Sequence, residues 1–201
     1  VGEVLSTLQE AGLADDTMIV FSTDHGDFLG ERGLWYKRSF FEPSSRIPLM
    51  VAGPGVIPGR ENRNVSLVDL LPTFVELAGG TETVGPLDGT SLLSGDVDVV
   101  FGENLSEGAT APILMAKEGS LKYCWSGCDD PQLFDLATDP HELTNLAGTG
   151  HAAEDRLDAM VHDRWDVETL GRLVEESQAR RTFLRTLYAG GTAPEWRQAP
   201  T

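Results

Sequence analysis

Lysine is scarce in this sequence: three lysines stand beside twelve arginines in 201 residues, and the formal net charge is −17. A nucleic-acid-binding protein needs a basic surface that neutralises phosphates, so the composition argues against a nucleic acid partner. Strong acidity with little lysine is typical of proteins that stay soluble in high salt, where charge repulsion is screened. We therefore expect a cytoplasmic protein of a halophile, with a functional acidic patch as the alternative.

Long apolar runs are also absent. No run reaches the roughly 18 residues that a membrane-spanning helix requires. The hydrophobic content of 40% fits a soluble globular protein, so we expect no membrane partner. The residues from Val1 onward show no basic and apolar cleavable leader, although a fragment could have lost one, so secretion has no support.

Cysteine is rare as well. The chain has two cysteines, Cys124 and Cys128, which are too few for a disulfide framework in a chain of this length. Their closeness permits a small disulfide loop but does not require one. A zinc site needs four ligands, and neither a second cysteine pair nor a suitably spaced histidine pair accompanies them. We expect two reduced thiols in a turn.

The most informative segment is a strand that ends in an Asp-His pair. Residues 18–22 form an apolar run, which predicts a strand buried on both faces, and Asp24 and His25 follow it. Open α/β sheets place ligand groups at the carboxyl ends of such strands. A hard divalent cation prefers oxygen ligands such as Asp24, while His25 completes the shell or bonds to a bound anion. Lys37 adds a compact positive charge for sulfate or phosphate oxygens.

This combination suits hydrolysis of an anionic ester at a metal. Each residue taken alone also fits a simpler interpretation. Asp24 fits a turn cap, His25 a loop histidine with satisfied hydrogen bonds, and Lys37 a solvated surface lysine.

Further motifs follow the pair in order along the chain. They are Glu31–Lys37, Ser39–Pro43, Arg46–Pro48, Gly53–Gly55 and Val68–Thr73. Together with the Asp24 segment they resemble the signature of the sulfatases, within the alkaline-phosphatase-like superfamily. The resemblance is closest to choline-sulfatases, through Phe40–Pro43, Pro131–Leu136 and Asp139–Leu146. It covers most of residues 1–150.

The resemblance implies an α/β fold class. The chain would be the C-terminal part of an alkaline-phosphatase-like sulfatase fold, a mixed sheet with helices plus a small antiparallel C-terminal subdomain. Sulfatases use a Cys or Ser, oxidised to formylglycine, in a Cys/Ser-x-Pro-x-Arg motif, and neither Cys124 nor Cys128 stands in that context. The family's first pair of metal carboxylates is absent too. The formylglycine nucleophile and most metal ligands would therefore come from an N-terminal part, and this chain alone would be inactive.

The resemblance also implies roles for residues that are present. Asp24 would bind the metal, His25 would bind metal or sulfate and act in catalysis, and Lys37 would bind substrate and neutralise charge on the leaving oxygen. Oxygen ligands favour calcium or magnesium over zinc, with calcium first. Glu107 resembles the acidic residue that faces the choline head group, with Glu103 as the competing choice and an exposed turn glutamate as the simpler interpretation.

Three functions remain open on the sequence. The first is a sulfuric ester hydrolase that takes a small sulfate ester such as choline sulfate. The second is a phosphoric ester or phosphonate hydrolase of the same superfamily. The third is a non-catalytic fragment or subunit-contact module, although half of a central sheet would leave an exposed edge.

Residue patterns divide the chain into three regions. Residues 1–96 would be the C-terminal portion of the catalytic core, 97–150 the antiparallel subdomain and 151–201 a helical extension with an irregular tail. In the core we expect helices at 2–13 and 66–78, with Asp69 in a first turn, strands at 18–22 and 47–52, and a long active-site loop at 24–45.

The second and third regions carry their own expectations. Strands are predicted at 97–101, 113–116, 121–125 and 132–136, and a turn into a short helix, acting as a structural brace, at 139–146. Helical spacing at 152–188 predicts a core-facing stripe. In choline-sulfatases the C-terminal extension is associated with oligomer contacts, so the resemblance implies a homo-oligomer through this tail.

Overall fold

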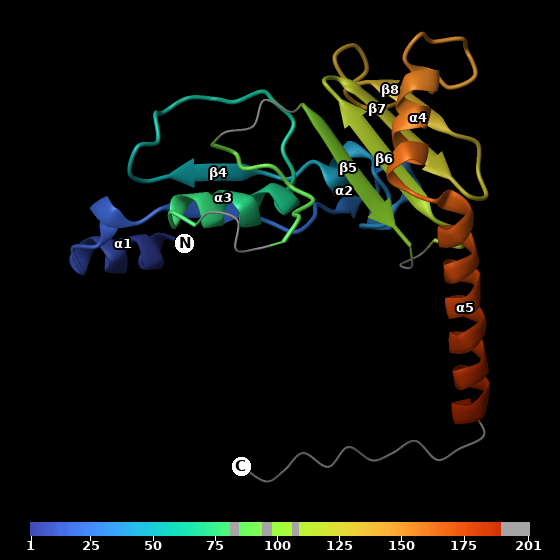
Figure 1. The fold of residues 1–201 in the computed structure, drawn as a ribbon, viewed down its shortest axis with the longest axis horizontal. Helices are drawn as coiled ribbons and strands as arrows, with labels where there is room; N and C mark the ends of the chain where they lie inside the picture. The colour runs from blue at the N-terminus through green and yellow to red at the C-terminus, as the bar shows by residue number, and fades with distance from the viewer. Residues whose placement is uncertain (81–84, 94–97, 106–108, 190–201) are drawn as a thin grey trace.

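The computed structural model describes residues 1–80, 85–93, 98–105 and 109–189. Figure 1 shows α1, β4 and α3 in one part of the molecule, and in the other a sheet with two C-terminal helices, with α2 beside the sheet. The helices are α1 (Gly2–Glu10), α2 (Glu42–Ser45), α3 (Leu70–Leu77), α4 (Glu154–Arg164) and α5 (Val167–Ala189), with short 3-10 turns η1 (Ala14–Asp16), η2 (Glu31–Gly33) and η3 (Leu67–Asp69). The strands are β1 (Ile19–Ser22), β2 (Phe28–Leu29), β3 (Trp35–Tyr36), β4 (Leu49–Ala52), β5 (Val99–Asn104), β6 (Ile113–Glu118), β7 (Leu121–Ser126) and β8 (Gln132–Asp135). The α/β class is confirmed.

β1 carries the candidate site at its carboxyl end. It pairs antiparallel with β4, from Ile19 opposite Ala52 to Ser22 opposite Leu49. The prediction that this strand is buried on both faces is wrong for the described residues, because none of its residues is buried and Phe21 is 40% exposed. The reason is that β4 is its only partner strand in the described chain, so no further strand shields it.

The C-terminal part contains an antiparallel sheet in the order β5-β6-β7-β8, as the sequence predicts. One face of this sheet packs against α4 and forms the main core. Leu114, Tyr123 and Leu133 of the sheet meet Leu157 and Val161 of α4 in this cluster. The predicted core-facing stripe of the helical extension is thus confirmed in α4.

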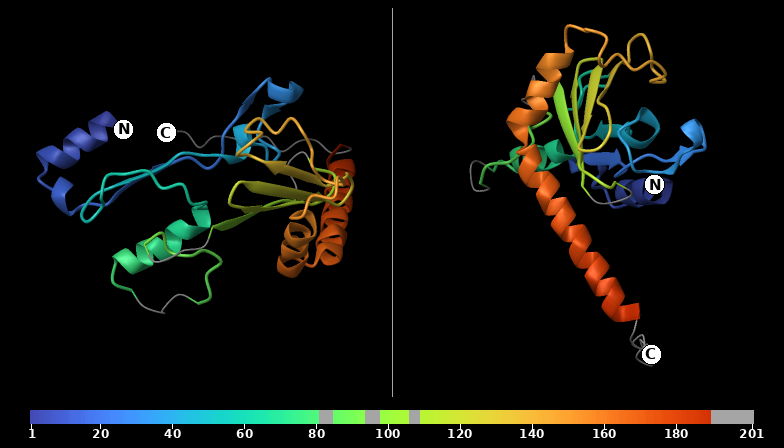
Figure 2. Two further views of the ribbon diagram at one scale, coloured as in Figure 1. Left: turned by 90° about the horizontal axis from the view of Figure 1, so that it is seen from above. Right: turned by 90° about the vertical axis from the view of Figure 1, so that its right-hand side faces the viewer.

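The opposite face of the sheet supports the long loop at 24–45. Side chains alternate across a strand, so Lys122 and Phe134 point away from the face that carries Tyr123. The Phe41 ring packs there, with its centroid 5.9 Å from that of Phe134 and 6.4 Å from that of Phe28. Figure 2 shows α4 and the 24–45 segment on opposite sides of the sheet. The sheet therefore joins the core to the loop that carries the candidate site.

The two cysteines are both free, but the expectation that both lie in a turn is wrong for Cys124, which belongs to a strand. Cys124 lies in β7 and is buried, whereas Cys128 is exposed. Burial raises the pKa of the Cys124 thiol to about 12, so this thiol stays protonated at neutral pH.

The helix predicted at 66–78 is present, and it begins with a turn of 3-10 geometry. The side chain of Ser66 and that of Asp69 form a reciprocal capping box, which confirms Asp69 as a first-turn residue. Asp69 also accepts a hydrogen bond from the Thr90 amide at 2.9 Å, so it ties the helix start to a neighbouring segment.

The short helix predicted within 139–146 does not form. Glu142 has φ 55, a left-handed conformation that a right-handed helix cannot contain, and the segment consists of turns. Its bracing role is confirmed, because Asn145 accepts a hydrogen bond from the Leu133 amide and donates to the Pro131 carbonyl.

α5 continues well beyond the sheet that supports its first turns (Figure 1). Val174 is its buried residue, and Gln178 still donates a hydrogen bond to the Thr110 carbonyl. In the described chain, no helix combines the length and apolarity that crossing a membrane requires. The irregular tail that was predicted to contact a neighbour lies outside the described residues.

Candidate functional site

The Asp24–His25 pair forms a tight turn directly after β1. The Asp24 carboxylate accepts hydrogen bonds from the His25 amide at 3.1 Å and from the Thr23 hydroxyl at 3.3 Å, both at Oδ1. Its second oxygen, Oδ2, lies 3.4 Å from Nε2 of His25. The other ring nitrogen, Nδ1, lies 2.8 Å from the Gly26 carbonyl. The turn thus fixes both side chains relative to each other.

This geometry directs two electron-pair donors to one place. In the tautomer in which Nδ1–H donates to the Gly26 carbonyl, Nε2 presents a lone pair beside Oδ2 of Asp24. Two such donors side by side favour a cation between them. Desolvation acts to raise the pKa of the Asp24 carboxyl, but backbone amides, the Thr23 hydroxyl and the His25 ring outweigh it and lower the pKa below its ordinary value. Asp24 is therefore ionised at neutral pH.

As a metal site the pair is incomplete. Calcium takes about six to eight oxygen ligands. In the part of the chain that the structure describes, no group of three or more His, Cys, Asp or Glu side chains could hold a metal. The Asp24 side chain is 77% exposed, so its free oxygen is open to ligands from elsewhere. The donor set fits one side of a metal site.

Lys37 returns toward this turn through a hairpin. β2 and β3 pair antiparallel with Phe28 opposite Tyr36, so the residue after Tyr36 comes back toward Asp27 at the start of the loop. Lys37 is half-buried, and its side chain has no ion pair or hydrogen bond with another described residue. The structure therefore brings the Lys37 backbone near Asp27, and within the described residues its side chain has no hydrogen bond or ion pair with Asp24 or His25.

The hairpin is held by an arginine that sequence reasoning missed. Arg32 has φ 56, and its guanidinium group lies 4.0 Å from the centroid of the Phe41 ring. The same group donates to the carbonyl oxygens of His141 and Glu142. No local pattern marks this role, because the two carbonyl partners lie more than a hundred residues along the chain.

A second missed group lies beneath α2. Lys122 in β7 is buried and forms ion pairs with Glu42 and Glu142. A lone lysine within the otherwise apolar run of residues 121–125 is the signal that could have found it. Charged side chains are rarely buried without a partner.

The candidate choline-binding residue Glu107 lies outside the described residues. The competing choice, Glu103, lies in β5 and accepts a hydrogen bond from the Trp165 indole at 2.9 Å. It lines a cavity of about 450 Å³ together with Arg63 and Arg164. Since neither Asp24 nor His25 lines this cavity, the structure does not bring Glu103 to the Asp24–His25 turn.

Comparisons with known proteins place these residues in context. A family model described as Sulfatase matches residues 1–80. The chain is 42% identical, over its full length, to the choline-sulfatase of Rhizobium meliloti (strain 1021), and it spans 41% of that relative.

Solved structures of other proteins have a fold similar to that of this chain. A crystal structure from Bacteroides thetaiotaomicron VPI-5482, described as a sulfatase, matches with a TM-score of 0.71 and 27% identity, over 81% of this chain and 39% of that one. The phosphonate monoester hydrolase of Agrobacterium radiobacter matches with a TM-score of 0.64 and 27% identity, over 79% of this chain and 36% of that one. The chain thus spans less than half the length of each of these relatives.

Proposed function

Because this chain belongs to the sulfatase family, we propose that it supplies the C-terminal part of the active site of a sulfuric ester hydrolase. The observation that carries the proposal is the turn after β1, where Asp24 Oδ2 and His25 Nε2 lie 3.4 Å apart and open to further ligands. An N-terminal part of the protein supplies the nucleophile and the remaining metal ligands. The 201 residues alone are then inactive.

Each residue of the half-site has a distinct role in this proposal. A divalent metal, calcium before magnesium, would supply positive charge that holds sulfate oxygens, and a formylglycine would supply the nucleophile. Asp24 binds the metal, and His25 orients its free nitrogen toward metal or sulfate. Lys37 places its ammonium group at the sulfate and offsets the negative charge that develops on the leaving oxygen.

Choline sulfate is the substrate that we propose to test first. Support comes from the choline-sulfatase of Rhizobium meliloti, which is 42% identical over the full chain. Glu107 would face the quaternary ammonium group, with Glu103 as the competing residue. The likeness to a phosphonate monoester hydrolase supports a phosphoric ester or phosphonate substrate as the second candidate. A non-catalytic subunit-contact module is the third.

The proposal extends to the setting of the enzyme. The acidic composition supports the cytoplasm of a halophile. Exposed apolar side chains on α5 support a homo-oligomer through the C-terminal extension. The proposal divides the chain into a portion of the catalytic core at 1–96, an antiparallel subdomain at 97–150 and a helical extension at 151–201.

The decisive experiment uses the protein expressed from its complete reading frame. Release of sulfate from choline sulfate and an aryl sulfate is compared with release of phosphate or phosphonate from the matching esters. The variants Asp24→Asn, His25→Ala and Lys37→Met should each lower kcat/KM by on the order of 100-fold, because each removes one preorganised charge or ligand.

A matched control is Asp15→Asn. Asp15 is an exposed carboxylate in η1, before the amino end of β1, so its loss should leave kcat/KM within a factor of about two. Faster turnover of phosphonate than of sulfate would transfer the assignment to the second candidate. If the complete, metal-loaded protein turns over no ester, the non-catalytic module is the remaining candidate function.

A further inference from the structure

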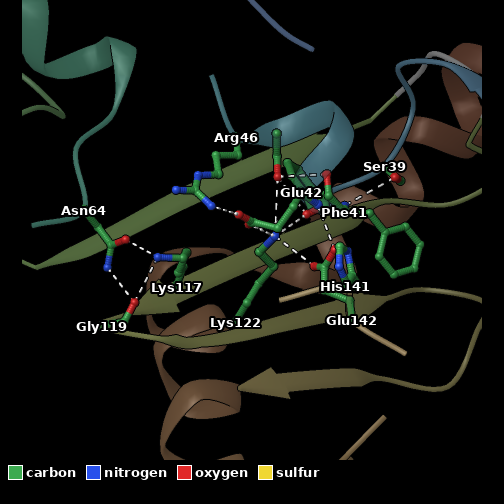
Figure 3. A network of polar contacts seen from close by, with 12 residues as sticks. Ser39, Phe41, Glu42, Arg46, Asn64, Lys117, Gly119, Lys122, His141 and Glu142 are labelled. Carbon is green, nitrogen blue, oxygen red and sulfur yellow. Dashed lines mark hydrogen bonds and ion pairs between the residues drawn. The ribbon is translucent and has the colours of Figure 1, made fainter. Parts of the chain in front are cut away.

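A lysine is buried on the sheet face that supports the active-site loop. The side chain of Lys122 is 1% exposed. Its Nζ lies 2.5 Å from Oε1 of Glu42, 2.9 Å from Oε1 of Glu142 and 2.7 Å from the carbonyl oxygen of Phe40. The Ser45 hydroxyl is farther away, at 3.5 Å. Figure 3 shows the carboxylates of Glu42 and Glu142 on either side of the Lys122 ammonium group.

Two buried side chains of the cluster, Lys122 and Glu142, pair with each other, and Glu42 also contacts an exposed arginine. Glu142 is also 1% exposed, and its second oxygen accepts the backbone amide of Glu42 at 2.8 Å. The guanidinium of Arg46 lies 3.7 Å from the free oxygen of Glu42, which offsets the second negative charge. Burying such charges carries a desolvation cost, and an apolar residue often serves stability equally well. Stability of the sheet alone therefore does not explain why charged residues occupy this buried position.

The contacts of Lys122 lead to the candidate site in two steps. Phe40, Glu42 and Ser45 flank or belong to α2, so the ammonium fixes that short helix. The Ser44 carbonyl of α2 accepts the Gly26 amide at 2.8 Å. Gly26 follows His25 directly, and its carbonyl lies 2.8 Å from Nδ1 of the histidine ring.

The contact between Gly26 and α2 is tightly packed. A Cβ atom placed on Gly26 would lie 2.1 Å from the Pro43 carbonyl oxygen, so the turn and α2 are in direct backbone contact. A shift of α2 by a fraction of an ångström must therefore move Gly26 and the ring of His25. Arg32 secures the same region from the hairpin side, through the Glu142 carbonyl and the Phe41 ring.

We propose that Lys122 is a positioning residue of the proposed metal half-site, acting through α2 on the Asp24–His25 turn. It touches neither metal nor substrate. The inference rests on the proposed function for its catalytic consequence, whereas the mechanical link from β7 to Gly26 is tested independently of activity.

The test compares three variants of the complete protein. Lys122→Met keeps the length of the side chain without its charge, and Lys122→Arg keeps the charge. The control is Lys117→Met. Lys117 is the cross-strand partner of Lys122 in β6 and is half-buried, but it donates to Asn64 and to the Gly119 carbonyl, and to no group of α2.

The first readout is amide hydrogen exchange at Gly26, whose N–H bonds to α2. Lys122→Met should speed this exchange at least tenfold at a temperature where global unfolding is negligible. Lys122→Arg should restore most of the protection, and Lys117→Met should leave it unchanged. Equal exchange in wild type and Lys122→Met, or equal loss in both Met variants, would overturn the proposal.

The second readout is metal dependence. The calcium concentration that gives half-maximal binding in a calorimetric titration should rise at least tenfold in Lys122→Met, with a matching fall in kcat. If Lys122→Met does not fold, Glu42→Gln removes one charge from the cluster at constant size and should change both readouts in the same direction by threefold or more. An unchanged Gly26 amide in that variant contradicts the mechanical link.

The two proposals fail separately. If the wild-type protein hydrolyses no ester, the proposed function fails, while Gly26 exchange still reports on Lys122. If wild type hydrolyses sulfate esters and Lys122→Met keeps normal Gly26 protection and calcium affinity, the positioning role fails alone.

Discussion

At the scale of single residues, Gly26 controls the packing of the half-site. Its backbone lies so close to Pro43 that a side chain has no room. Its amide is also the hydrogen-bond donor that joins the turn to α2. Gly26 is therefore required by close approach of two backbones, and an L-residue must push them apart.

We predict that Gly26→Ala lowers both activity and stability. The added methyl group must displace α2 or the turn, which should reduce kcat at least tenfold and the free energy of unfolding by about 1–3 kcal/mol. Gly171→Ala is the control, because that helical glycine in α5 has nothing within 4 Å of an added Cβ. It should raise stability by about 0.5–1 kcal/mol without changing kcat. Urea unfolding and initial rates of sulfate release measure both effects. A Gly26→Ala protein with full activity would mean that the contact is loose in solution.

Residue chemistry could be predicted only where partners are close in sequence. Asp24 and His25 adjoin each other, so their joint position follows from the chain itself. Lys122 and Glu42 are 80 residues apart, and their pairing is decided by how β7 packs under the loop. A single sequence does not show that these two residues lie close together in space. It shows only that an isolated lysine interrupts an apolar strand.

At the scale of elements, the far end of α5 presents an apolar face. Phe183, Leu184, Leu187 and Tyr188 are exposed, at 62%, 43%, 58% and 71%. With 3.6 residues per turn these four side chains lie on one side of the helix, and Thr182 and Thr186 lie on the opposite side. Exposed apolar side chains grouped in this way favour an interaction site.

We predict that this face joins copies of the chain. The double variant Phe183→Asp/Leu187→Asp should shift the complete protein from oligomer to monomer, because it places charge in an apolar contact. The control Thr182→Asp/Thr186→Asp adds the same two charges to the other side of α5 and should keep the oligomer. Sedimentation velocity at several protein concentrations distinguishes them. A wild-type protein that is monomeric throughout contradicts the prediction directly.

Elements with a clear period were predictable, and very short ones were not. The four antiparallel strands follow from short apolar runs separated by turn residues, and α3 follows from the helical spacing of apolar residues within 66–78. The hairpin of β2 and β3 was missed, since each strand has two residues and shows no alternation. The helix expected within 139–146 does not form, because Glu142 has a left-handed backbone conformation, and the contact of its carboxylate with Lys122 could not be read from the sequence.

At the scale of the whole molecule, the main feature is the large negative net charge. A charge of −17 on 201 residues implies repulsion among carboxylates throughout the surface. Screening shortens the range of that repulsion from about 10 Å at 0.1 M salt to about 3 Å at 1 M. Salt should therefore favour folding. A halophilic cytoplasm would provide such a salt concentration.

We predict that the thermal unfolding midpoint rises as KCl increases from 0.1 to about 2 M. Asp15→Asn/Asp16→Asn, which neutralises two exposed carboxylates of η1, should raise the midpoint at low salt and reduce its dependence on KCl. Differential scanning calorimetry of both proteins measures this. A midpoint that is flat or falls with KCl would exclude adaptation to high salt.

The separation of Glu42 and Lys122 along the chain also has a consequence in time. Ribosomes extend a chain at about 5–20 residues per second, so the 80 residues between the two partners take roughly 4–16 s to synthesise. During that interval the loop that carries Asp24 and His25 has already been made, but the strand that secures it has not. We therefore expect the Asp24–His25 turn to be secured only after β7 has been synthesised, when Lys122 can bind the residues of α2.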